Sequence, residues 1–385
     1  MPRVPARCDL VLATTTDLAA LNASSLHFLG LAKALHAGGL TVTILAPRPS
    51  GALTVELNPS IGRIFTPNIP GLPRSAAIAL MWPALRRLSL AQNLYVRSGV
   101  GTLGLVKAAR ALGFKRIVVE NNGWFEDDLA VLGTSKPLQS LARRLQIAEA
   151  RSADGVRVVT RGLGRLFEAN GIAPEKIHHI GNGTDLDVFK PGNRSTAKQA
   201  LGLSPETDVI VFVGNLWPAI DLPVVFQAAA LLERRRPDLT IVVVGDGVAR
   251  ATFETAATQF LPRSDAVRWL GSRIPSEANA VLAAADVAIA PFVAARNERI
   301  GLSPLKLHDY AAAGRIVVAT ELPGISDFGD QPWLHLAKAH DAASYANAID
   351  DALSADRQTA EASARIFAEQ NFGWAVVARR VAALF

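Results

Sequence analysis

The chain has 385 residues, of which half are hydrophobic and 19% are charged. This length is too great for one compact core and fits two domains of about 150–200 residues each. The longest uninterrupted apolar run, residues 76–85, is half as long as the roughly 20 residues of a membrane-spanning helix. The composition therefore excludes a transmembrane protein. The single cysteine, Cys8, excludes an internal disulfide and a thiolate zinc cluster.

The net charge of +6 is unevenly distributed. Residues 1–190 carry nine more basic than acidic side chains, whereas residues 191–385 carry three more acidic than basic side chains. A basic half indicates an anionic partner. No aromatic ladder accompanies the basic residues, so we expect no nucleic-acid binding. The segment 80–88 fits an anionic membrane surface, and an ordinary core helix with a charged edge is the alternative.

Short apolar runs alternate with segments of helical period through residues 9–180. Predicted strands cover residues 9–13, 41–46, 94–97, 116–120, 155–159 and 177–180, and predicted helices cover 24–37, 101–112, 136–153 and 161–170. Nearly continuous Val, Ile and Leu strands separated by helices indicate a parallel sheet that is covered on both faces. The first domain is therefore a doubly wound α/β domain.

The same alternation restarts after a polar stretch with Pro and Gly at residues 190–195. Predicted strands cover residues 209–213, 240–244, 267–270, 287–290 and 316–319, and predicted helices cover 222–233, 249–259, 275–285 and 305–313. We expect a first domain over residues 1–190, completed by a carboxyl-terminal helix at 373–385, and a second over 191–372. Two such domains place a ligand cleft between the carboxyl ends of two sheets.

Several segments carry a recognisable pattern. Residues 180–191 contain Asn-Gly-Thr-Asp followed by Phe-Lys-Pro, and residues 303–314 are Ser-Pro-Leu-Lys-Leu-His-Asp-Tyr-Ala-Ala-Ala-Gly. These two segments resemble motifs of glycosyltransferase family 4. Five further segments resemble the same family in the same order along the chain: residues 211–216, 242–247, 267–274, 284–291 and 372–374. The resemblance implies the GT-B fold, in which two Rossmann-like domains face each other across a cleft. It also implies retaining transfer of a sugar from a nucleotide-diphospho-sugar, with no metal or other cofactor required.

The segment from residue 303 also has a physical interpretation. A loop that enters a helix at Pro304 points free backbone N–H groups of Leu305 and Lys306 at a diphosphate. The Lys306 side chain is either a phosphate contact or a solvated charge, and Asp309 is either a ribose acceptor or a surface acid. The resemblance adds further candidate donor-binding residues: Gly214, Asn215, Arg273, Ile274, Arg299 and Ser303.

The chain departs from the family pattern at three positions. Gly301 stands where the family has the first glutamate of this motif, and Glu298 three residues earlier is the catalytic candidate in its place. Asn215 and Ile220 stand where the family places an arginine and a lysine that neutralise the diphosphate. The arginines at positions 273, 296 and 299 are candidate substitutes.

In the first domain, polar residues follow the strand at 116–120. Glu120 and Asn121 are candidate catalytic residues, and Asn122 and Asn22 are candidate acceptor-binding residues, because strand-end acids and amides suit sugar hydroxyls. A cluster that only caps its loop is the alternative.

The function that we predict is a retaining, hexosyltransferase-type glycosyltransferase in cell-surface polysaccharide or glycolipid synthesis. Its expected partners are a nucleotide sugar, a glycan or lipid-linked acceptor, and an anionic membrane surface. No signal-peptide pattern precedes the first strand, so we expect a cytoplasmic protein, peripheral at the inner face of the plasma membrane. The missing charges leave a second hypothesis, a catalytically silent GT-B protein that binds a partner or a sugar nucleotide.

Overall fold

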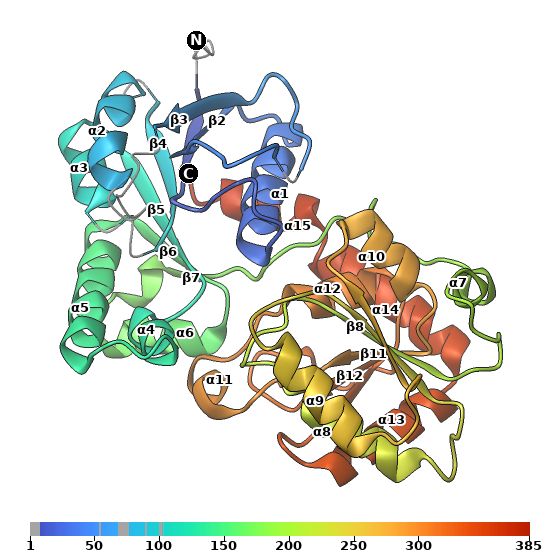
Figure 1. The fold of residues 1–385 in the computed structure, drawn as a ribbon. Coiled ribbons are helices and arrows are strands. Elements are labelled where there is room, and N and C mark those ends of the chain that lie inside the picture. The colour runs from blue at the N-terminus through green and yellow to red at the C-terminus, as the bar shows by residue number, and fades with distance from the viewer. Residues whose placement is uncertain (1–7, 54, 68–76, 89–90, 100–101, 103) are drawn as a thin grey trace. The chain divides into compact units, whose positions relative to one another are not determined.

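The computed structural model describes residues 8–53, 55–67, 77–88, 91–99, 102 and 104–385. The chain forms two compact units (Figure 1). The first unit comprises Met1–Gly183, Arg299–Ser303 and Trp374–Phe385, and the second comprises Thr184–Glu298 and Pro304–Gly373. The structure thus divides the chain seven residues before the expected boundary at 190. It also places Arg299–Ser303, which lie within the expected second domain, in the first unit.

The first unit is built on a seven-stranded sheet in the order β3-β2-β1-β4-β5-β6-β7. Every strand pair in it is parallel, which confirms the predicted doubly wound class. The strands are β1 (Leu10–Ala13), β2 (Val42–Pro47), β3 (Gly62–Thr66), β4 (Asn93–Arg97), β5 (Arg116–Asn121), β6 (Gly155–Val158) and β7 (Ile177–His179).

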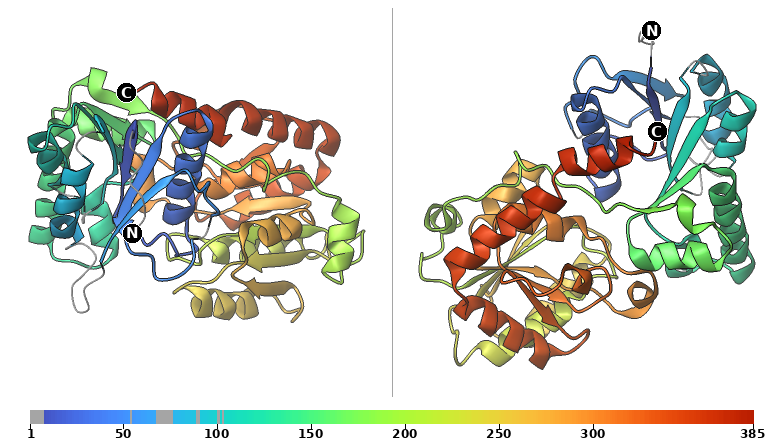
Figure 2. Two further views of the ribbon diagram at one scale, coloured as in Figure 1. Left: turned by 90° about the horizontal axis from the view of Figure 1, so that it is seen from above. Right: turned by 180° about the vertical axis from the view of Figure 1, so that it is seen from behind.

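Helices cover both faces of this sheet. One core lies under α2 (Ala77–Arg87), α3 (Leu105–Ala111), α5 (Lys136–Ser152) and α6 (Arg161–Ala169), and α4 (Phe125–Val131) packs on α5. The other core lies under α1 (Ala23–Ala37) and α15 (Trp374–Ala382), which pack together (Figure 2). The terminal helix therefore fills the first unit's core, and the Cβ that any other residue would add at Gly183 would lie 2.4 Å from the Trp374 ring.

The second unit has a six-stranded parallel sheet in the order β10-β9-β8-β11-β12-β13. Its strands are β8 (Val209–Val213), β9 (Thr240–Val244), β10 (Val267–Gly271), β11 (Val287–Ala290), β12 (Val317–Thr320) and β13 (Leu334–Ala337). Its helices are α7 (Arg194–Ala200), α8 (Leu222–Leu232), α9 (Arg250–Phe260), α10 (Pro275–Leu282), α11 (Ala295–Ile300), α12 (Leu305–Ala312), α13 (Ala342–Ser354) and α14 (Arg357–Asn371). Helix α8 packs with α9 and α13, and α12 packs with α14.

Two strands and several helices lie outside the predicted set. Strands β3 and β13 are the edges of their sheets, where one side of the strand has no partner and the side chains are only partly buried. Such strands lack the continuous apolar run of a central strand. The acidic residues 126–128 form the first turn of α4.

The segment 80–88 packs as the alternative interpretation expected. Met81, Leu85 and Leu88 are buried in the core, whereas Trp82, Arg86 and Arg87 are exposed. These three apolar side chains therefore serve the core of the first unit. No helix among the described residues is long and apolar enough to cross a bilayer.

Candidate functional sites

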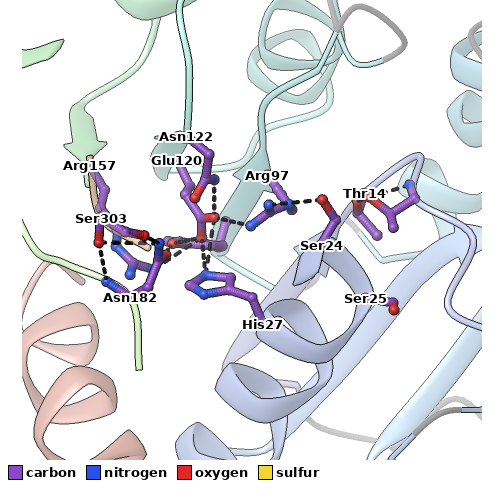
Figure 3. A network of polar contacts seen from close by, with 12 residues as sticks. Thr14, Ser24, Ser25, His27, Arg97, Glu120, Asn122, Arg157, Asn182 and Ser303 are labelled. Atoms are coloured by element: carbon purple, nitrogen blue, oxygen red, sulfur yellow. Dashed lines mark hydrogen bonds and ion pairs between the residues drawn. The ribbon is translucent and has the colours of Figure 1, made fainter. Parts of the chain in front are cut away.

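A buried carboxylate lies at the carboxyl edge of the first sheet (Figure 3). Glu120, near the end of β5, is fully buried and binds the Arg157 guanidinium at 3.0 Å and His27 Nε2 at 3.1 Å. It also accepts hydrogen bonds from Tyr95, Arg97 and Asn122. Both carboxylate oxygens therefore have several donors. Four elements meet at this one side chain: α1, β4, β5 and β6.

The charges of this network explain its protonation state. Burial alone would raise the pKa of Glu120, but the charges of Arg157 and Arg97 and the contact with His27 outweigh burial and hold that pKa well below its usual range. Burial lowers the pKa of His27 to about 4, so His27 is neutral at pH 7. A carboxylate with so low a pKa is a weak base. The geometry therefore favours an orienting role for Glu120 over the base that its strand-end position suggested.

The amides predicted beside Glu120 take different positions. Asn121 is buried, and its Oδ1 accepts a hydrogen bond from Gln146 of α5 at 2.8 Å. Asn122 is partly exposed and donates to Glu120. Asn22 is exposed and caps α1, because its Oδ1 accepts from the backbone N–H of Ser25 at 3.0 Å. Asn122 is thus the member of the strand-end cluster that is open to a ligand.

In the second unit, the loops after β8 and β9 pack tightly against each other. A Cβ at Gly245 would lie 1.9 Å from the carbonyl oxygen of Gly214, so this close approach requires glycine. The backbone N–H of Gly214 donates to the Val244 carbonyl oxygen at 2.9 Å, and that of Leu216 donates to the Asp246 backbone carbonyl oxygen at 2.9 Å. These contacts hold the loop of Gly214 and the exposed Asn215 in a fixed shape at the carboxyl edge of the sheet.

Lys306 of α12 reaches this loop. Its Nζ lies 3.1 Å from the position that a Cβ of Gly214 would take, 4.1 Å from the ring centre of Phe212 and 4.9 Å from that of Phe292. In the part of the chain that the structure describes, Lys306 forms no hydrogen bond and no ion pair. Burial lowers its pKa to about 7. The protonated amine therefore lacks a counter-ion, which an anionic ligand would supply.

Two further residues of α12 fix its position. Tyr310 is buried, and its hydroxyl donates to the Val213 carbonyl at 3.1 Å and accepts from the Val213 N–H at 2.8 Å, which ties α12 to the end of β8. Asp309 accepts a hydrogen bond from Thr184 Oγ1 at 2.5 Å. Burial raises the pKa of Asp309 to about 7. The free carboxyl oxygen of Asp309 is thus one turn from the amino terminus of α12.

The other predicted donor-site residues make contacts of their own or are exposed. Ile274 is the amino-terminal cap of α10 and is half-exposed, and among the described residues Arg273 beside it is bonded only to the Ser272 carbonyl. Glu298 is exposed on α11. Arg299 and Ser303 belong to the first unit, where Arg299 pairs with Asp127 and the Ser303 carbonyl accepts from Asn182 at 2.9 Å. The side chain of Arg296 lies outside the described residues.

The sequence predictions missed His27, Arg97, Arg157 and Thr184. Two of them carried a signal. Arg157 stands inside a short buried strand, and Arg97 ends another, where an unpaired charge would be costly. Each therefore required a buried acid nearby. His27 and Thr184 carried none, because only the fold brings them to Glu120 and Asp309.

Two parallel α/β units in series, each with polar groups at the carboxyl edge of its sheet, define the GT-B class of fold. The model of "Glycosyltransferase Family 4" matches residues 24–188, and that of "Glycosyl transferases group 1" matches residues 207–355. The chain belongs to glycosyltransferase family 4, of the group 1 type.

Curated relatives share part of the chain. A D-inositol 3-phosphate glycosyltransferase of Catenulispora acidiphila is 29% identical over 230 residues, which are 57% of this chain and 52% of the relative. The corresponding enzyme of Mycobacterium sp. (strain KMS) is 31% identical over 195 residues, which are 49% of this chain and 42% of the relative. The chain thus matches about half the length of these relatives.

Solved structures share the fold over nearly the whole chain. HepE of Anabaena in complex with UDP and glucose superposes with a TM-score of 0.76, at 17% identity and with 98% of this chain and 99% of that chain covered. WaaG, a glycosyltransferase of lipopolysaccharide biosynthesis, superposes with a TM-score of 0.73, at 16% identity and with 97% and 99% covered. These likenesses confirm the predicted fold.

Proposed function

We propose that this protein transfers a sugar from a nucleotide-diphospho-sugar to an acceptor hydroxyl with retention at the anomeric carbon. The observation that carries the proposal is Lys306, a cation without a counter-ion that lies against the glycine loop after β8. Family membership supports a sugar nucleotide as the anion. The amino terminus of α12, from which Lys306 projects, adds backbone N–H groups and a positive dipole.

In this proposal the second unit stabilises the departing diphosphate. Lys306 and the N–H groups of Leu305 and Lys306 contact the phosphate oxygens, where negative charge develops as the sugar leaves. Asp309 accepts a hydrogen bond from the ribose. Lys306 is then the side-chain cation of this diphosphate seat, because Asn215 and Ile220 carry no charge.

The first unit supplies the acceptor-binding groups in the proposal. Glu120 holds Asn122 and Arg97 at the edge of the sheet, and Arg97 also donates to the Ser24 hydroxyl at 3.3 Å. Amide and guanidinium N–H groups at that edge suit the hydroxyls of a sugar or polyol. The likeness of the fold to WaaG and the basic charge of residues 1–190 support an acceptor in cell-surface polysaccharide or glycolipid synthesis.

The first test is binding of the donor. We would measure the thermal shift of the protein with UDP-, GDP-, ADP- and TDP-sugars, and compare the wild type with Lys306→Met and Asp309→Ala. The proposal predicts stabilisation by one nucleotide class that is lost in both variants. A matched control, Arg234→Met, removes an exposed cation just after the end of α8 that the proposal does not place at the donor site, and it should retain the shift. No shift with any nucleotide would contradict the proposal.

A silent sugar-nucleotide binder is the second candidate. Gly301 in place of a glutamate, and the absence of cations at Asn215 and Ile220, favour it. It predicts the same thermal shift but no release of nucleoside diphosphate from the bound donor. Turnover therefore separates the two candidates.

A further inference from the structure

Helix α5 carries an apolar stripe on its outer face. Leu138, Leu141 and Leu145 are spaced three and four residues apart, so they lie on one side of the helix. Val131 and Leu132, at the end of α4, are also exposed, and α4 packs on α5. The exposed fractions of these five side chains lie between 42% and 62%. We call these five residues the α4–α5 apolar face.

This concentration is unusual for the protein. Among the described residues, twelve large hydrophobic side chains are exposed, and five of them fall within residues 131–145. Scattered exposed leucines need no explanation, but a contiguous group marks an interaction surface. The opposite side of α5 meets the ordinary needs of the core, because Ala142, Ile147 and Ala150 are buried there.

The charges around the face indicate its partner. Residues 129–148 contain Lys136, Arg143 and Arg144 and no acidic residue. Arg143 pairs with Glu126 at 3.7 Å. Lys136 and Arg144 are exposed, and neither has a hydrogen bond or ion pair within the described part of the chain. The acidic residues nearest in sequence before the face, 126–128, lie in the first turn of α4, where Glu126 pairs with Arg143 and Asp127 pairs with Arg299. Leucines flanked by two free cations match the interface of an anionic bilayer, in which acyl chains lie beneath phosphate groups.

We propose that the α4–α5 apolar face, with Lys136 and Arg144, binds the protein to anionic lipid bilayers. The leucines enter the boundary between headgroups and acyl chains, and the two cations contact lipid phosphates. The face differs from the segment 80–88, whose Leu85 and Leu88 are buried in the core. Lipid binding by this face requires no sugar nucleotide, so its failure would leave the donor proposal unchanged.

The same helix also orders a candidate acceptor group on its inner side. Gln146 donates to the Asn121 side chain at 2.8 Å and to the Gly123 carbonyl at 3.0 Å. One rigid element therefore joins the lipid-binding face to the strand end of β5. A lipid-linked acceptor held in the bilayer would be presented near that strand end.

The test is co-sedimentation of the full chain with vesicles of equal parts phosphatidylglycerol and phosphatidylcholine, and with pure phosphatidylcholine vesicles. We expect binding to the anionic vesicles that weakens with salt. The triple variant Leu138→Gln/Leu141→Gln/Leu145→Gln should bind at least about tenfold more weakly, since its apolar area no longer enters the bilayer. Lys136→Gln/Arg144→Gln should weaken binding to anionic vesicles by about tenfold and leave binding to neutral ones unchanged.

Controls make the result specific. Leu231→Gln/Ile366→Gln removes equally exposed apolar side chains from the second unit and should bind as the wild type does. Circular dichroism and Tm should match the wild type in every variant, because the altered side chains are exposed. Binding retained in the triple-leucine variant, or absent from the wild type, would overturn the proposal. So would a self-association in lipid-free solution that the triple variant abolishes, because the face would then bind a second copy.

Discussion

Replacing Lys306 with methionine should make the protein more stable and less active. Lys306 is held between two aromatic rings without a counter-ion, and its pKa is lowered by burial to about 7. The unfolded chain binds a proton at this residue up to a pH of about 10. Between these values the unfolded state binds more protons, so the lysine reduces stability below pH 7 and progressively less as the pH rises. Methionine fills the same space and has no charge to desolvate.

The loss of activity can be estimated from the interaction that Lys306 would make. A charge pair at about 4 Å is worth about 4 kcal/mol at the effective dielectric of a partly exposed site, before desolvation is subtracted. Removal of one preorganised donor from a site where charge develops typically costs about a hundredfold in rate. We therefore expect kcat/KM for the nucleotide sugar to fall about a hundredfold in Lys306→Met.

Calorimetry gives a more specific test of the same residue. A diphosphate beside Lys306 favours its protonated form, so binding at pH 8 should take up a proton, which titrations in buffers of different ionisation enthalpy measure. The uptake should disappear in Lys306→Met, whose Tm at pH 7 should be several degrees higher than that of the wild type. A variant with unchanged donor affinity and unchanged proton uptake would refute the reasoning. Uptake that remains would instead assign the proton to Asp309.

Three further predictions concern buried carboxyl groups. Burial raises the pKa of Asp309 to about 7, so stability should fall as the pH rises from about 4 to 7; this fall should be absent from Asp309→Asn in a series of Tm measurements. Glu120→Gln leaves Arg97 and Arg157 buried without a counter-charge and should cost about 3–5 kcal/mol, seen as a large drop in Tm; an unchanged Tm would contradict the network. Burial raises the pKa of Glu149 to about 8, so Glu149→Gln should gain Tm relative to the wild type as the pH rises from 5 to 8; parallel pH profiles would contradict this.

Most of the fold could be predicted because the strands of a covered parallel sheet are continuous apolar runs. Strand β9 was predicted with its observed ends, since every residue from Thr240 to Val244 is buried. Strands β3 and β13 were missed because their partly exposed sequences, Gly-Arg-Ile-Phe-Thr and Leu-His-Leu-Ala, carry no such run. The terminal helix was expected to complete the first domain, but its partner α1 could not be predicted, because that packing is a contact between distant parts of the chain.

The candidate sites were predictable to a smaller extent. Local patterns identified Glu120, Lys306 and Asp309, because each stands at the end of a strand or in the first turns of a helix. Their partners come from other elements, as Thr184 does for Asp309, and the sequence order contains no trace of these contacts. The role of Glu120 depends on those partners: a strand-end acid suggests a base, and two arginines make it a fixed anion. The cleft and the donor contacts of Arg273, Ile274, Arg299 and Ser303 stay predictions.

The proposed transfer is tested most directly by following the donor itself. The nucleotide sugar selected by the thermal shifts would be incubated with the wild type and with a membrane extract as the source of acceptor, and observed by proton NMR. We predict release of nucleoside diphosphate and a product whose anomeric configuration matches that of the donor, both reduced about a hundredfold in Lys306→Met. A donor that binds but stays intact in the wild type would contradict the transferase and leave a silent binder.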